Sequence, residues 1–193
     1  MNFRNLSFQE SKLKEGIARF DIQSQQKILE AMKLAKRAHN GQMRDEGDPF
    51  IIHPIRVANI LLSDLQVDDS ELIIAGLLHD VVEDSDITAE EITRQFDERV
   101  GNLVIALTRY KDKETKREKF EKDLIGPADV RLIKTCDWVD NLRSLPFRIH
   151  RDEKYERIKR EAGEMYITLA EATGNDWLII EMKKAYAEVL SIG

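Results

Sequence analysis

The segment ELIIAGLLHDVVED, residues 71–84, constrains the fold of this chain more than any other part of the sequence. Its apolar residues cover most of the circumference of a helix and show no period-two alternation, which predicts a helix buried near the centre of the fold. His79 and Asp80 lie next to each other within this apolar run. Because an isolated charge is costly to bury, both side chains need partners. The segment therefore predicts a polar site inside a helical core.

Most of the remaining sequence has helical periodicity as well. Apolar residues recur at helical spacing in segments 21–41, 53–65, 88–96, 102–108, 128–145, 153–172 and 176–190. Residues 41–50 contain two glycines and a proline and predict a loop. His39, at the end of the first helix, is expected to cap that helix or brace the loop. We predict an all-α fold, a compact single-domain bundle of residues 21–193, after an N-terminal extension of residues 1–20 that forms an extra helix or a dimer contact.

Composition narrows the class of protein. A chain of 193 residues with 42% hydrophobic and 34% charged residues is typical of one globular domain. A net charge of −6 argues against non-specific nucleic-acid binding, and no stretch approaches the roughly 20 apolar residues that span a bilayer. The N-terminus lacks the apolar run of a secretory signal. The only cysteine, Cys136, suits a reducing compartment, so we expect a cytoplasmic protein without a membrane or nucleic-acid partner.

The polar residues of the central helix predict a metal site. Positions four apart on a helix lie above one another, so His79 is expected to pair with Glu83 and Asp80 with Asp84. A single buried histidine is most often an ordinary core residue, but this cluster and Asp137, itself inside the apolar helix VRLIKTCDWVDNL, favour a ligand role. The candidate metal ligands are two imidazoles and two carboxylates: His53, His79, Asp80 and Asp137. Such ligands suit Mn²⁺, Fe²⁺, Zn²⁺ or Mg²⁺.

Three longer segments carry a family resemblance: AHNGQMRDEGDPFIIHPIRVANIL, AGLLHDVVEDSDITAEEI and LIKTCDWVDNLRSL. Together they resemble the RelA/SpoT hydrolase domain of the HD superfamily of metal-dependent phosphohydrolases, in particular its stand-alone small alarmone hydrolases. The resemblance covers roughly Ile28 to Gly174. It implies an HD-type helical fold, a bound Mn²⁺, and hydrolysis of the 3′-pyrophosphate of (p)ppGpp by metal-activated water. It also implies that the four candidate ligands hold the metal and that Glu83 and Asp84 form the catalytic acidic pair.

The same resemblance suggests substrate contacts. Arg44 matches a family residue in a loop near the nucleotide base and ribose, and Asn141 matches a family residue that faces the sugar. Two interpretations stay open for Lys134, Arg143 and the charged run 111–122: they contact phosphates, or they form a solvated surface. Asp45 stands where many family members carry a cation. Adenine alarmones such as (p)ppApp, or another phosphorylated nucleotide such as NADPH, therefore remain alternatives. A separate alternative is a non-catalytic metal- or nucleotide-sensing module, which the presence of Glu83 and Asp84 disfavours. A homo-oligomer is equally open.

Overall fold

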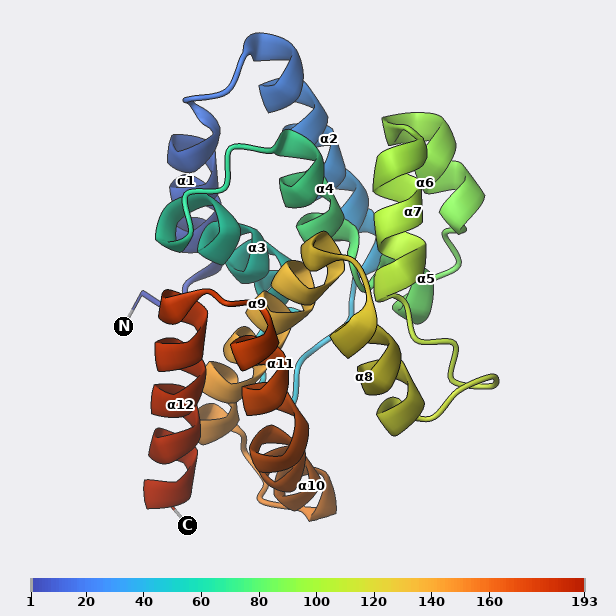
Figure 1. Ribbon diagram of the computed structural model, residues 1–193. Helices are drawn as coiled ribbons and strands as arrows, with labels where there is room; N and C mark the ends of the chain where they lie inside the picture. The colour runs from blue at the N-terminus through green and yellow to red at the C-terminus, as the bar shows by residue number, and fades with distance from the viewer. Residues whose placement is uncertain (1, 193) are drawn as a thin grey trace. The chain divides into compact units, whose positions relative to one another are not determined.

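The computed structural model describes residues 2–192, which form helices joined by turns and loops (Figure 1). No β-strand occurs among these residues, so the all-α prediction is confirmed. The chain divides into two compact units: a first unit of residues up to Gln42 together with Pro49–Lys113, and a second unit of Met43–Asp48 together with residues from Glu114 onward. The single domain of residues 21–193 stays a prediction.

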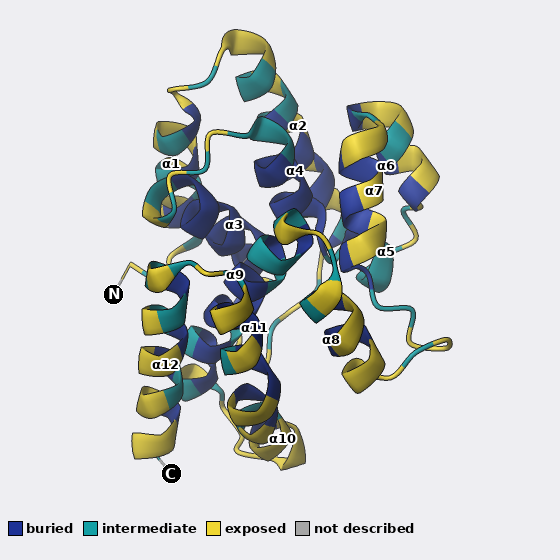
Figure 2. Ribbon diagram, viewed as in Figure 1, coloured by how far each residue is buried: buried dark blue, intermediate teal, exposed yellow. Residues whose placement is uncertain are grey.

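The first unit is built around one buried helix. Its helices are α1 (Leu6–Ile17), α2 (Ile22–Ala38), α3 (Ile52–Asn59) with the π-helical turn η1 (Ile60–Asp64), α4 (Ser70–Leu78), α5 (Val81–Asp84), α6 (Ala89–Phe96) and α7 (Glu98–Leu107). Helix α4 packs against α2, α3 and α7, and its residues from Leu72 to Leu78 are buried (Figure 2). The apolar run thus forms the centre of this unit, because it has no face suited to water.

The predicted continuous helix 71–84 is wrong at one place. Helix α4 ends at Leu78, and α5 begins at Val81, so His79 and Asp80 form a turn between them. The His79 imidazole Nδ1 lies 2.8 Å from the Gly76 carbonyl oxygen, an acceptor that the last turn of a helix leaves free. Gly76 also permits close packing, because a β-carbon there would lie 2.8 Å from Leu61 Cδ1 of η1. The imidazole therefore satisfies one of the carbonyl groups that the end of α4 exposes.

The start of α4 provides a test of stability. The Asp69 carboxylate accepts hydrogen bonds from the backbone N–H groups of Glu71 and Leu72 and from the Arg99 guanidinium, the last at 2.8 Å. Asp69→Ala should lower the free energy of unfolding by about 1 to 2 kcal/mol because it removes the helix cap. Chemical denaturation of the variant measures this change. The neighbouring Asp68→Ala is the control and should have little effect, since the Asp68 side chain is 82% exposed.

The effect of Asp69 should also depend on pH. Burial alone would raise the pKa of Asp69, but the hydrogen bonds from Arg99 and the backbone outweigh it and lower the pKa below its usual value. A carboxylate whose pKa is lower in the folded state stabilises the fold above the unfolded pKa of about 4. This contribution is lost as the pH falls through the folded pKa. The stability difference between wild type and Asp69→Ala should therefore shrink below about pH 4, and a constant difference down to lower pH would contradict this reading.

The second unit is organised around α9. Its helices are α8 (Lys116–Ile125), α9 (Ala128–Ser144), the 3₁₀ turn η2 (Leu145–Phe147), α10 (Glu153–Glu161), the π-helical turn η3 (Ala162–Tyr166), α11 (Ile167–Ala172) and α12 (Asp176–Ser191). Helix α9 packs against α8, α11 and α12, and the Trp138 ring stacks on Tyr166 with centroids 3.9 Å apart. Residues 116–122 of the charged run 111–122 belong to α8 and are helical. Within residues 2–192, no helix is both long and apolar enough to cross a membrane.

Candidate metal and catalytic site

Three of the four predicted metal ligands converge in the first unit. His53 lies in the first turn of α3, and His79 and Asp80 form the turn between α4 and α5. The His79 Nε2 atom lies 3.2 Å from His53 Nε2 and 3.2 Å from Asp80 Oδ2, and His53 Nε2 lies 3.5 Å from the same carboxylate oxygen. Both imidazoles are almost fully buried. Among the described residues, this is the group of histidine and acidic side chains whose donor atoms gather closely enough to hold a metal ion.

The donor atoms fit a divalent cation. Ligand bonds of about 2.0 to 2.2 Å place neighbouring ligand atoms about 3.0 to 3.5 Å apart, which is the spacing seen here. The hydrogen bond between His79 Nδ1 and the Gly76 carbonyl requires the proton on Nδ1, so Nε2, the nitrogen that faces His53 and Asp80, carries the lone pair that a metal would use. Two imidazoles and a carboxylate are ligands that suit divalent transition metals. The turn between α4 and α5 therefore forms a candidate metal centre.

The acidic pair of α5 is held by basic residues that follow α7. Glu83 accepts a hydrogen bond of 3.1 Å from the Arg109 backbone N–H, and its carboxylate lies 3.3 Å from Lys111 Nζ. Lys111 Nζ also lies 3.0 Å from Asp84 Oδ1. Burial alone would lower the pKa of Lys111, but Asp84 and Glu83 outweigh it and raise the pKa, so the ammonium persists at neutral pH. Helical spacing had suggested His79 as the partner of Glu83, and no sequence pattern pointed to Arg109.

Four further predicted residues form a connected chain in the second unit. Arg44 Nη2 donates to Asn141 Oδ1 at 3.0 Å, and Asn141 Nδ2 donates to Asp137 Oδ1 at 2.6 Å. Lys134 Nζ lies 2.9 Å from the other Asp137 oxygen. Arg44 is also paired at 2.6 Å with Glu46, a buried residue that no sequence pattern singled out. The fourth predicted metal ligand, Asp137, thus belongs to α9 and is linked there to three predicted substrate contacts.

Comparison with known proteins shows the family. Residues 31–175, more than half of the chain, match the family model described as HD domain. The chain belongs to the HD domain family. This HD domain is 40% identical over 158 residues to the guanosine-3′,5′-bis(diphosphate) 3′-pyrophosphohydrolase of Aquifex aeolicus, a match that covers 79% of this chain and 22% of the relative. It is 34% identical over 168 residues to the GTP pyrophosphokinase of Myxococcus xanthus, covering 81% of this chain and 22% of that protein.

A solved structure supports the same family. It is described as a metazoan ortholog of SpoT that hydrolyzes ppGpp, and it matches this HD domain with a TM-score of 0.74 and 26% sequence identity. The match covers 84% of this chain and 94% of that one. The HD domain spans less than a quarter of the length of the two curated relatives but nearly all of this structural neighbour.

Two residues of the HD domain have partners that the sequence did not indicate. Asp45 lies 2.6 Å from Lys154 Nζ and 3.0 Å from Arg148 Nη2, so its charge is compensated within the second unit. Arg143, a predicted phosphate contact, pairs with Glu181 at 2.7 Å. Asp45 is therefore an anchor of the loop that carries Arg44, and Arg143 is bound to α12.

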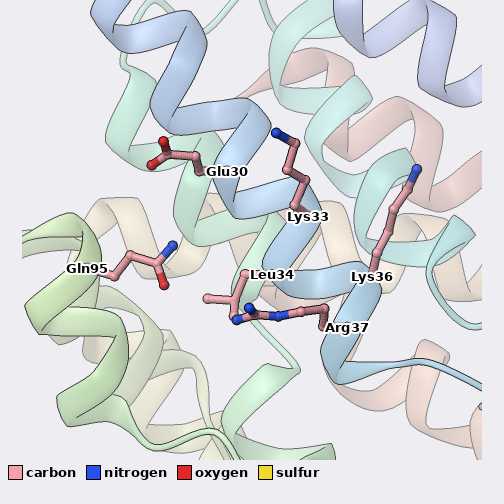
Figure 3. Close-up of a pocket in the computed structure, with 6 residues that line it drawn as sticks. All are labelled: Glu30, Lys33, Leu34, Lys36, Arg37 and Gln95. Carbon is pink, nitrogen blue, oxygen red and sulfur yellow. The ribbon is translucent and has the colours of Figure 1, made fainter.

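None of the predicted site residues lines a surface hollow in the first unit of the HD domain. It measures about 460 Å³, and its lining residues come from α2 and α6 (Figure 3): Glu30, Lys33, Leu34, Lys36, Arg37 and Gln95. Neither a histidine nor a pair of carboxylates lines it, and Lys36 pairs with Glu10 at 2.8 Å. With a single carboxylate and no histidine in its lining, the hollow does not have the ligand set of a transition-metal site.

Proposed function

We propose that this HD domain is a metal-dependent hydrolase that removes the 3′-pyrophosphate of (p)ppGpp and leaves GDP or GTP. The observation that carries the proposal is the gathering of His53 with His79 and Asp80, the last two of which lie one turn before the acidic pair of α5. The names of the Aquifex relative and of the metazoan structural neighbour support (p)ppGpp as the substrate.

We assign the cation to His53, His79, Asp80 and Asp137, with Mn²⁺ as the native metal. The mixed nitrogen and oxygen ligands support an ion of this kind. When bound, such a cation supplies Lewis acidity toward phosphoryl oxygens and lowers the pKa of a water molecule. The second imidazole nitrogen of His79, held by the Gly76 carbonyl, keeps the ring in the orientation that a metal requires.

The carboxylates of α5 are the groups that would handle the proton. In the proposed reaction, the oxygen of water bonds to the phosphorus next to the ribose 3′-oxygen, and the bond from that phosphorus to the 3′-oxygen breaks. Glu83 or Asp84 accepts the proton of the attacking water, and the leaving 3′-oxygen is protonated from solvent. Arg109 and Lys111 hold the two carboxylates in place.

Cationic and amide side chains of the second unit would bind the nucleotide. The substrate carries several negative charges, so an acidic protein needs local cations to hold it. Arg44, Lys134 and Asn141 are linked through Asp137, and we assign them to the base, sugar and phosphates. Arg143 could reach a phosphate only by leaving Glu181. These contacts are supported by the family resemblance and by the connection of the three side chains to one carboxylate.

Product analysis of the Mn²⁺-loaded protein tests the proposed function. With ppGpp as substrate, we expect GDP and pyrophosphate, and chelation of the metal should abolish both products. Parallel reactions with ppApp and NADPH test the alternatives that the acidic Asp45 leaves open, and a reaction with ATP and GTP tests the synthesis implied by the name of the Myxococcus relative. Release of a single phosphate, or faster turnover of ppApp or NADPH than of ppGpp, would overturn the assignment.

We further propose that the protein works in the cytoplasm. Its one cysteine, Cys136, is a buried free thiol in α9. A chain without disulfides is suited to a reducing compartment. Fractionation of cells that express the chain would check this location.

A further inference from the structure

His39 lies at the C-terminal end of α2, in the first unit, and belongs to neither the proposed metal ligands nor the acidic pair. Its backbone N–H donates to the Ala35 carbonyl, and its side chain is buried. The ring stacks on Phe50 with centroids 4.5 Å apart, and Nδ1 lies 2.9 Å from the side-chain oxygen of Gln42. The Nε2 atom is buried without a hydrogen-bond partner. The expected brace of the loop is present, and its contacts lead toward the candidate site.

The hydrogen bonds determine which nitrogen of His39 carries the proton. Gln42 Nε2 donates to the Asp84 carbonyl oxygen at 2.7 Å, which sets the orientation of the amide. The amide oxygen of Gln42 therefore faces His39 and can only accept, so His39 Nδ1 is the donor. Burial lowers the pKa of His39, in keeping with a neutral ring. His39 thus acts as a single-donor group with a defined tautomer.

Two series of side-chain contacts, here called the two chains of contacts, connect His39 with the candidate site. The first passes through Gln42 to the Asp84 carbonyl at the end of α5, which bears the acidic pair. The second passes through the Phe50 ring, whose edge meets His53 with centroids 6.1 Å apart. The two chains are joined, because the Phe50 backbone N–H donates to the Gln42 carbonyl at 3.0 Å. One buried ring therefore contacts the supports of both a metal ligand and a catalytic carboxylate.

We propose that His39 is a positioning residue that orients His53 through Phe50 and the acidic pair of α5 through Gln42. The inference rests on the proposed function, since it assumes a metal at His53 and a reaction at the acidic pair. Residues that orient metal ligands and catalytic groups typically contribute about 10- to 100-fold to metal affinity or activity. The two chains of contacts make separate contributions, which two substitutions can distinguish.

His39→Phe and His39→Asn each preserve one of the two contacts. Phenylalanine keeps a ring over Phe50 but cannot donate to Gln42, so kcat for ppGpp should fall about 10- to 100-fold while Mn²⁺ affinity stays near wild type. Asparagine keeps a donor near the position of Nδ1 but loses the stacked ring, so the dissociation constant of Mn²⁺ should rise about tenfold or more. Calorimetric titration with MnCl₂ measures the affinity. His150→Asn, at an exposed histidine, is the matched control and should change neither quantity.

A double-mutant cycle tests whether His39 acts through Gln42. Gln42→Met removes both hydrogen bonds of the amide at nearly constant volume, so it should lower kcat as much as His39→Phe does. The double variant should then lose no more than either single variant, because both remove one connection. Gln42→Met also tests this connection if His39→Phe fails to fold.

Several results would overturn the inference. If both His39 variants keep the kcat and the Mn²⁺ affinity of the wild type, His39 positions nothing. If kcat, Mn²⁺ affinity and melting temperature fall together, His39 has a role in folding alone. If the losses of kcat in the two single variants add up in the double variant, His39 does not act through Gln42. A wild-type protein that binds no Mn²⁺ would overturn the proposed function as well, whereas an active wild type with unaffected His39 variants would overturn this inference only.

Discussion

Replacing His79 with alanine should abolish metal retention and lower ppGpp hydrolysis by about a thousandfold or more. Loss of the cation removes several kcal/mol of charge stabilisation, and each 1.4 kcal/mol corresponds to about tenfold in rate. The His79 Nε2 atom lies within 3.2 Å of donor atoms from both His53 and Asp80, so its removal breaks the group of ligands at its centre. Metal content after purification with MnCl₂ and pyrophosphate release together measure the effect.

The His79 variant needs controls for folding, because its imidazole is buried and bonded to the Gly76 carbonyl. Asp80→Asn removes a ligand charge at nearly constant shape and should lose the metal as well, without loss of the circular dichroism of the helices. Asp137→Ala tests the fourth ligand in the same way. His150→Ala, at an exposed histidine, should retain both metal and activity. A His79→Ala protein that still binds manganese as wild type does would refute the metal centre.

Glu83→Gln should lower the hydrolysis rate by about 10² to 10⁴-fold while leaving metal binding intact. The amide preserves the shape of the side chain and can still accept the hydrogen bond from the Arg109 backbone N–H, but it cannot take a proton from water. Glu83 is not among the donor atoms of the metal group, so Mn²⁺ affinity should change little. Rates under saturating ppGpp, with Mn²⁺ affinity measured in parallel, separate these two quantities.

The control for this experiment lies on the same segment. Asp86→Asn changes an exposed carboxylate just beyond α5 and should have a rate near that of wild type. Asp84→Asn completes the comparison: whichever of the two α5 variants loses more activity marks the proton acceptor, because the other carboxylate only orients the water. Near-normal rates in both Glu83→Gln and Asp84→Asn would remove the acidic pair from the mechanism.

The sequence predicted the helical class well because apolar periodicity reports directly on which faces are buried. The run of residues 71–84 was expected at the centre, and α4 is the helix that packs against α2, α3 and α7. Periodicity could not reveal the turn at His79 and Asp80, since a hydrogen bond from the imidazole to the Gly76 carbonyl competes there with the backbone ladder. A pattern of apolar residues carries no information about such a bond.

Residue types alone also predicted a metal site in this HD domain, whereas the reaction came from the family resemblance: histidines and carboxylates within apolar helices must find partners, and a shared metal ion is one that suits them. Only the tertiary structure decided which partners they have. Arg109 and Lys111 reach Glu83 from the segment after α7, and Gln42 reaches Asp84 across 42 residues of sequence. Lys154 likewise neutralises Asp45 from 109 residues away. Such contacts depend on how helices pack, and packing over these separations leaves no periodic trace in the sequence.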